Sequence, residues 1–179
     1  AVLLSLAHAG KEDKRTIRFA DFGWTIEVPA NTRFRDSSFD AAGRLRPGLL
    51  PLQEDEAVWL FSIGNDNICE MAFVIRKDTL GAHKWDSVQA AYNKTYFKQL
   101  EEVRLIKVSG KSYDTVIIGG TLFRKQVVKY TGRDSDGEIT VVHYYGLAKG
   151  YDIEIKWECN KAALSSTYEA IAASLRFDP

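Results

Sequence analysis

One nine-residue segment constrains the fold more than any other part of the chain. From Tyr151 to Cys159, apolar and polar residues alternate without a break, which predicts a β-strand with one buried face and one solvated face. Directly after this strand, four apolar residues recur at helical spacing and predict an amphipathic helix: Leu164, Tyr168, Ile171 and Leu175. The apolar stripe of that helix needs a partner, and the sheet that contains the preceding strand is the nearest apolar surface.

Turn sequences rich in glycine and asparagine divide the rest of the chain into further strands. A second helix is predicted over residues 88–100, with Asp86 as its N-cap. Because the links between strands are short, we expect antiparallel pairing. The expected fold is α+β: a single antiparallel sheet of about six or seven strands flanked by two main helices. Residues 19–179 form one domain in this interpretation, and residues 1–18 form a separate N-terminal segment.

Residues 31–57 lack a clear periodicity and contain several glycines and prolines, which predicts a long irregular surface segment. Four arginines lie in this segment: Arg33, Arg35, Arg44 and Arg46. Guanidinium groups near one rim could bind carboxylates or phosphates through paired hydrogen bonds. The alternative is that they are ordinary solvated residues that pair with the neighbouring acidic side chains.

Charge and hydropathy bear on the partners and on the compartment. Lys plus Arg and Asp plus Glu both number 24, so no net field attracts nucleic acid. Every apolar run is interrupted before the roughly 20 residues that a membrane-spanning helix needs. The apolar run Ala1 to Leu6 is followed by a small-x-small pattern, Ala7-His8-Ala9, which resembles the end of a secretory signal. We expect a periplasmic or secreted protein, with a cytoplasmic location as the alternative.

Cys69 and Cys159 are the two cysteines of the chain, and both fall on the apolar side of predicted strands. In an oxidising compartment a disulfide between them would close a long loop, which is worth on the order of 4 kcal/mol in the chain-entropy model. Two buried free thiols are the alternative, because cysteine is among the most buried residue types. Their spacing is that of neither a zinc site nor a redox motif.

No residue cluster has the spacing of a known catalytic or cofactor site. Ser109-Gly110-Lys111-Ser112 resembles the end of a phosphate-binding loop, but the first glycine of that motif is missing. The three histidines lack the spacing of metal ligands. His143, in a predicted strand, could act as a base beside a carboxylate, although a hydrogen-bonded sheet histidine is the commoner case. We therefore predict no catalytic residue, no metal site and no cofactor.

Two terminal segments carry a family resemblance. The opening strand Gly23-Trp24-Thr25-Ile26-Glu27-Val28-Pro29 and the ending Ala170-Ile171-Ala172-Ala173-Ser174-Leu175-Arg176-Phe177, with the order of elements between them, resemble the PsbP-like superfamily. The resemblance implies a sandwich of helices around an antiparallel sheet, and a binding protein more often than an enzyme. It assigns no partner-binding residue to this chain.

These observations favour a non-enzymatic accessory or protein-interaction module of the bacterial cell envelope. It would hold another protein through the 31–57 surface together with a sheet edge or a helix face. The alternative function is a small hydrolase or ligand-binding enzyme with a pocket under the 31–57 loop, with His143 and a nearby carboxylate as base and acid. The sequence leaves the oligomeric state open.

Overall fold

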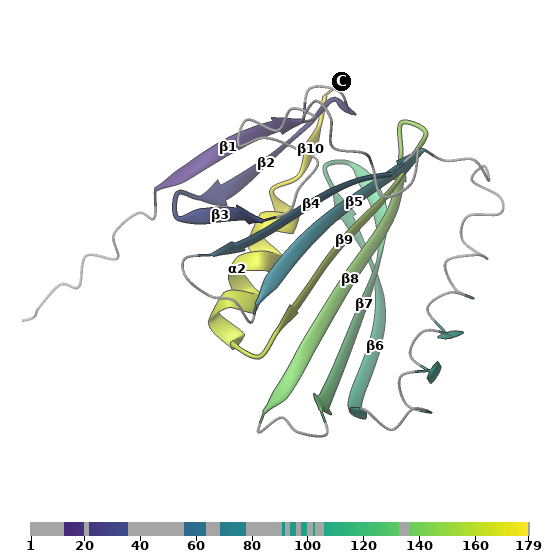
Figure 1. Cartoon of the computed structure of the whole chain (residues 1–179). Helices are drawn as coiled ribbons and strands as arrows, with labels where there is room; N and C mark the ends of the chain where they lie inside the picture. Colours follow the sequence, from purple (N-terminus) through teal and green to yellow (C-terminus); the bar gives the residue numbers. More distant parts are fainter. Residues whose placement is uncertain are drawn as a thin grey trace, which may run out of the picture.

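The computed structural model describes residues 13–19, 22–35, 56–63, 69–77, 106–132 and 137–178, together with Ala91, Lys94, Thr95, Lys98, Gln99 and Glu102. Its largest element is a seven-stranded sheet in the order β3-β4-β5-β9-β8-β7-β6 (Figure 1). The strands are β3 (Thr32–Arg35), β4 (Glu56–Ile63), β5 (Glu70–Lys77), β6 (Ile106–Ile118), β7 (Thr121–Gly132), β8 (Glu138–Ala148) and β9 (Tyr151–Cys159). All neighbouring strands run antiparallel, as predicted.

A second, smaller sheet has the order β1-β2-β10, with β1 (Lys14–Phe19), β2 (Trp24–Pro29) and β10 (Arg176–Phe177). The strand predicted near the start of the domain lies in this sheet, because β1 occupies one edge of β2 and β10 occupies the other. A strand with both edges paired cannot also join the larger sheet. Residues 14–18, which we assigned to a separate N-terminal segment, are therefore part of β1.

One helix has its bounds within the described part of the chain: α2 (Ala162–Ala173), which follows β9 as predicted. Of the helix expected over residues 88–100, the structure describes only isolated positions such as Ala91 and Lys98, which have helical backbone and are exposed. The other residues of that range lie outside the described residues. The expected fold, a single sheet flanked by two main helices, is thus wrong: the described chain forms two antiparallel sheets and one bounded helix.

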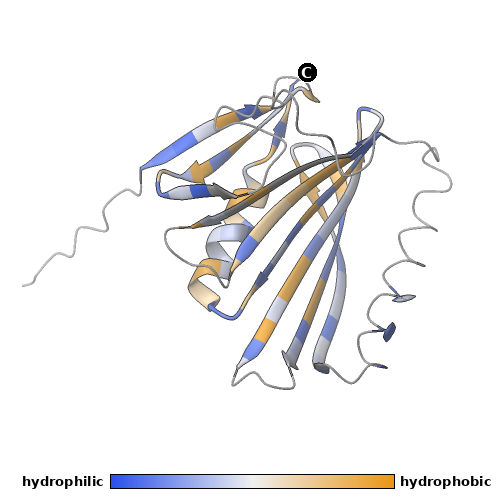
Figure 2. Ribbon diagram, in the orientation of Figure 1, coloured by the Kyte–Doolittle hydropathy of each residue, from blue (hydrophilic) through white to orange (hydrophobic). Residues whose placement is uncertain are grey.

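The core lies between the small sheet, α2 and one face of the large sheet, and hydrophobic and hydrophilic residues alternate along the strands (Figure 2). Trp24 of β2 stacks on Phe19 of β1 with ring centroids 4.5 Å apart, and its ring lies 5.6 Å from that of Phe73 on β5. From α2, Tyr168 packs 6.3 Å from Trp157 of β9. Aromatic rings therefore join the two sheets and the helix in one core.

The two faces of the large sheet differ in what they carry. We call the face that bears Trp157 and Phe73 the inner face, and the opposite face the outer face. The strand register places His143, Glu154 and Lys156 on the outer face, because these residues alternate with the inner-face residues. No helix in the described part of the chain is long and apolar enough to span a membrane.

Candidate interaction surface

Three large apolar side chains are exposed on the β6–β7 hairpin: Tyr113 is 65% exposed, Ile117 75% and Leu122 56%. Ile117 lies directly opposite Leu122 across the hairpin, and Tyr113 lies opposite Gln126, so all three share the outer face. We call these three residues the edge patch. Ile117 and Leu122 are direct neighbours, and Tyr113 lies further along the same face, beyond Thr115. Exposed apolar residues that gather on one face are a mark of interaction sites in soluble proteins, whereas single ones are ordinary.

The turn of this hairpin requires its two glycines. Gly119 and Gly120 have φ values of 57° and 81°, as a two-residue type I′ turn demands. A Cβ at Gly119 would lie 2.8 Å from the carbonyl oxygen of Leu175, two residues after the end of α2. The turn is thus packed against the segment that leads into β10, which fixes the end of the hairpin relative to the core.

The outer edge of β6 is open within the described part of the chain, since β6 pairs there with β7 alone. Ile118 and Thr121 flank the two-residue turn, and such a closing pair exchanges hydrogen bonds across the hairpin. Along a strand, the backbone N–H and C=O groups of successive residues point alternately to the two neighbouring edges. Those of Ile118 point to β7, so those of Tyr113, Thr115 and Ile117 point to the open edge. In agreement, the Thr115 N–H donates to the carboxylate of the adjacent Asp114 at 2.7 Å.

A buried polar cluster lies on the outer face at the centre of the sheet. The Glu154 carboxylate lies 3.3 Å from Arg76 Nη1 and 3.5 Å from Lys156 Nζ. His143 is also buried, and its Nδ1 contacts the Tyr145 hydroxyl. Burial lowers the pKa of His143 to about 4, against the opposing influence of Glu154 and with a smaller lowering by Lys156. The imidazole is therefore neutral at physiological pH.

This geometry gives His143 a structural role. Its Nδ1 lies 3.9 Å from Glu154 Oε1, too far for the hydrogen bond of an acid–base pair, and the Tyr145 hydroxyl already contacts that nitrogen. A neutral, buried imidazole paired with a phenol completes the polar layer on the outer face. His143 is therefore not placed as the general base that the alternative function requires.

A cavity of about 300 Å³ lies between the small sheet and α2. Lys14 and Glu27, an ion pair 3.8 Å apart, line this cavity together with the buried Ile171. Thr167 of α2 also lines the cavity, and its hydroxyl already donates a hydrogen bond of 3.1 Å to the Ala163 carbonyl oxygen. The described lining residues of this cavity come from β1, β2 and α2 and their flanks, and neither His143 nor Arg33 is among them.

Two of the predicted binding arginines lie on β3, at the sheet edge opposite β6. Arg33 is exposed and pairs across the sheet with Ser62, and Arg35 pairs with Leu60. Residues 32–35 are thus a strand and not part of an irregular loop. Arg44 and Arg46, with the rest of residues 36–55, lie outside the described residues, so the grouping of the four arginines stays a prediction.

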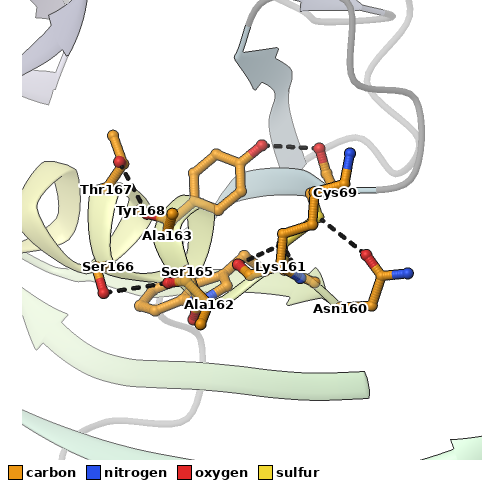
Figure 3. Close-up of a disulfide and its surroundings, with 11 residues drawn as sticks. Cys69, Asn160, Lys161, Ala162, Ala163, Ser165, Ser166, Thr167 and Tyr168 are labelled. Carbon is orange, nitrogen blue, oxygen red and sulfur yellow. Dashed lines mark hydrogen bonds between the residues drawn. A yellow bond between two sulfur atoms is a disulfide. The ribbon is translucent and has the colours of Figure 1, made fainter. Parts of the chain in front are cut away.

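Cys69 and Cys159 form a disulfide that closes a sequence separation of 90. They lie side by side at one end of β5 and β9, with Cα atoms 4.5 Å apart. Figure 3 shows the hydroxyl of Tyr168 on α2 directed at the Cys69 carbonyl, to which it donates a hydrogen bond of 2.7 Å. The disulfide thus lies where two strands and the helix meet.

The sequence did not identify the edge patch. Apolar residues in a β-prone segment are usually buried, so their presence there did not predict an exposed patch. One signal was present: in residues 113–118, Tyr113 and Ile117 lie on one face while Val116 and Ile118 lie on the other. A strand with apolar residues on both faces either sits in the middle of a layered structure or exposes one of its faces.

Comparison of the sequence with protein-family models and with curated proteins finds no match. Among solved structures, the fold is similar to that of cyanobacterial PsbP (CyanoP) from Synechocystis sp. PCC 6803, with a TM-score of 0.59, 11% identity and 98% of each chain covered. A protein from Bacteroides thetaiotaomicron matches with a TM-score of 0.50 and 12% identity over 88% of this chain. That match covers 46% of the Bacteroides chain, so this chain spans about half its length. The resemblance of the fold to PsbP is confirmed.

Proposed function

We propose that this protein is a non-enzymatic interaction module that binds a protein partner at the β6 edge, through the edge patch. One observation carries the proposal: Tyr113, Ile117 and Leu122 are all more than half exposed on the same face of the same hairpin. Solvent exposure of three such side chains costs free energy that burial against a partner would recover, at about 25 cal/mol per Å² of apolar surface.

The backbone of β6 supports the same proposal. A partner strand can add to an open sheet edge, where main-chain hydrogen bonds supply affinity and alternate side chains supply specificity. On β6, Tyr113 and Ile117 direct backbone groups outward and also contribute side chains to the edge patch. The opposite edge of the sheet, formed by β3, is a less suitable binding surface. β3 has only four residues, and the one side chain on it that is described as exposed belongs to the charged Arg33.

We also propose that the protein works outside the reducing cytoplasm, in the periplasm or after secretion. The Cys69–Cys159 disulfide supports this location, since structural disulfides persist mainly in oxidising compartments. Thiol alkylation and mass spectrometry of the protein from fractionated source cells test it. Alkylation of both cysteines without prior reduction would contradict this location.

Site-specific photo-crosslinking in the source cells tests the binding function. A benzophenone amino acid replaces Ile117 in one full-length variant and Ala163, an exposed residue of α2, in a matched control. We expect irradiation to give discrete covalent protein adducts with the first variant and none with the second. Equal adduct patterns, or no adduct at position 117, would show that the edge patch is not a binding surface.

A further inference from the structure

The edge of β6 with which no described strand pairs has a sequence that can pair with itself. When two copies of a strand pair antiparallel about a two-fold axis perpendicular to the sheet, residues at equal distances on either side of the axis face each other. The faces of the two sheets then remain continuous, so the outer faces of both copies merge. The choice of axis decides which side chains meet.

An axis at Thr115 gives the best pairing along β6. It places Tyr113 opposite Ile117 of the second copy, and this aromatic–aliphatic pair occurs twice by symmetry. Asp114 faces Val116, and Lys111 faces Gly119, so no charge lies directly opposite a like charge. The two edge patches would lie on the same face on either side of the new junction.

Neighbouring axes are less favourable. An axis at Asp114 sets two carboxylates directly opposite each other, which is destabilising. An axis at Tyr113 places the irregular Val108–Gly110 region of one copy opposite Ile117 of the other. A bulge there twists the strand and breaks the regular ladder. The axis at Thr115 leaves that region outside the paired segment.

The Asp114 carboxylate fits this interpretation as a temporary partner. In the single chain it accepts the hydrogen bond from the outward-facing Thr115 N–H, at 2.7 Å. An aspartate on an edge strand discourages indiscriminate strand addition. On pairing at the two-fold axis, the Thr115 N–H would donate to the Thr115 carbonyl oxygen of the second copy in place of the Asp114 carboxylate. Pairing would also bring the Asp114 carboxylates of the two copies nearer to each other, which opposes it.

We infer that the partner at the edge patch is a second copy of this chain, joined by β6–β6 pairing about a two-fold axis at Thr115 into a continuous fourteen-stranded sheet. The inference rests on the proposed function, because it names the occupant of the surface proposed there. Each copy contributes the seven strands of its large sheet.

Analytical ultracentrifugation of the full chain over a concentration series tests the inference. We expect a reversible dimer whose dissociation constant rises at least tenfold in Thr115→Pro, since proline removes an outward-facing N–H that donates to the adjacent Asp114 carboxylate in the single chain and not to the β7 ladder. Ile117→Lys, which leaves the backbone intact, should weaken the dimer in the same way. Asp114→Ala should tighten it, because the Thr115 N–H loses its internal acceptor and the two carboxylates disappear.

Crosslinking tests the register. In Thr115→Cys a short bis-maleimide should join two copies, whereas in Lys107→Cys it should not, because these positions would lie about 50 Å apart along the paired strands. Crosslinking at position 107 and not at 115 would overturn the register, and a dimer unaffected by Thr115→Pro and Ile117→Lys would overturn the interface.

If the chain is monomeric at all concentrations but position 117 still gives photo-adducts with other proteins, the self-pairing inference fails and the proposed function stands. A monomer without adducts at position 117 would refute both.

Discussion

The hydroxyl of Tyr168 donates a hydrogen bond of 2.7 Å to the carbonyl oxygen of Cys69, a residue 99 positions earlier in the chain. Tyr168 is buried on α2, and Cys69 precedes β5 and is covalently bound to Cys159 at the end of β9. Helix, strands and disulfide therefore support one another at a single point. Stability measurements can separate their contributions.

Removal of the disulfide should destabilise the fold strongly. For Cys69→Ser with Cys159→Ser we expect the free energy of unfolding to fall by on the order of 4 kcal/mol, because the unfolded chain regains the entropy of a long open loop. Urea denaturation measures the change. Reductant should lower the stability of the wild type by a similar amount and leave the double variant unaffected. An unchanged midpoint in the double variant would contradict the prediction.

Loss of the Tyr168 hydroxyl should cost less. In Tyr168→Phe the ring keeps its packing against Trp157, but the Cys69 carbonyl loses its donor, so we expect a loss of about 1 kcal/mol in stability. Thermal unfolding followed by circular dichroism gives the comparison. Tyr113→Phe is the matched control and should cost less, since the Tyr113 side chain is largely exposed and its hydroxyl accepts a long hydrogen bond, of 3.4 Å, from Gln126 Nε2.

A methyl group at position 146 should have no room. A Cβ on Gly146 would lie 2.4 Å from a ring carbon of Phe123, which is fully buried directly opposite on β7. Overpacking of this kind costs about 1–3 kcal/mol, so Gly146→Ala should be clearly destabilised. Gly137→Ala meets open space and serves as the control. Combining Gly146→Ala with Phe123→Leu should cost less than the sum of the two single changes; strict additivity in urea denaturation would show that the residues do not compete for space.

The neutral His143 should make stability depend on pH. Its pKa is about 4 in the folded protein and near 6.5 when unfolded, so the unfolded state binds the proton more readily. The contribution to stability is fully present above pH 6.5, declines as the pH falls toward 4, and is level below that; its size is on the order of 3 kcal/mol. His143→Gln should flatten the stability profile between pH 6.5 and 4. A wild-type profile that is already flat over this range would contradict the prediction.

Short-range sequence patterns were enough to predict the strands, helix and turn that depend only on residues close together in the chain. β9 and α2 follow from the periodicity of residues 151–175, and the hairpin of β6 and β7 follows from Gly119 and Gly120. The small sheet was not predicted, because β2 is paired on one edge by β10 from the far end of the domain, and no short-range signal records that contact. The pairing of Cys69 with Cys159 stayed open for the same reason: it depends on β5 and β9 being neighbours.

Burial was harder to predict than secondary structure. The three side chains of the edge patch are apolar, as core residues are, yet they are exposed on a hairpin whose β6 is the last described strand of its sheet. His143 and Glu154 are polar residues of the kind expected at a surface or in an active site, yet both are buried, on two strands that lie inside the sheet. The order of strands, which decides both cases, is a property of the whole fold.

The arrangement of the small sheet has a consequence for synthesis. Phe177 pairs with Trp24, the Asp178 N–H donates to the Gly23 carbonyl at 2.7 Å, and Arg18 pairs with the Asp178 carboxylate at 2.8 Å. On the ribosome, β1 and β2 can form their hairpin early, but one side of β2 must wait until residues 176–178 have emerged. Translation of almost the whole domain therefore precedes the closure of this sheet, and a nascent chain stalled before that point would present an unpaired strand to chaperones.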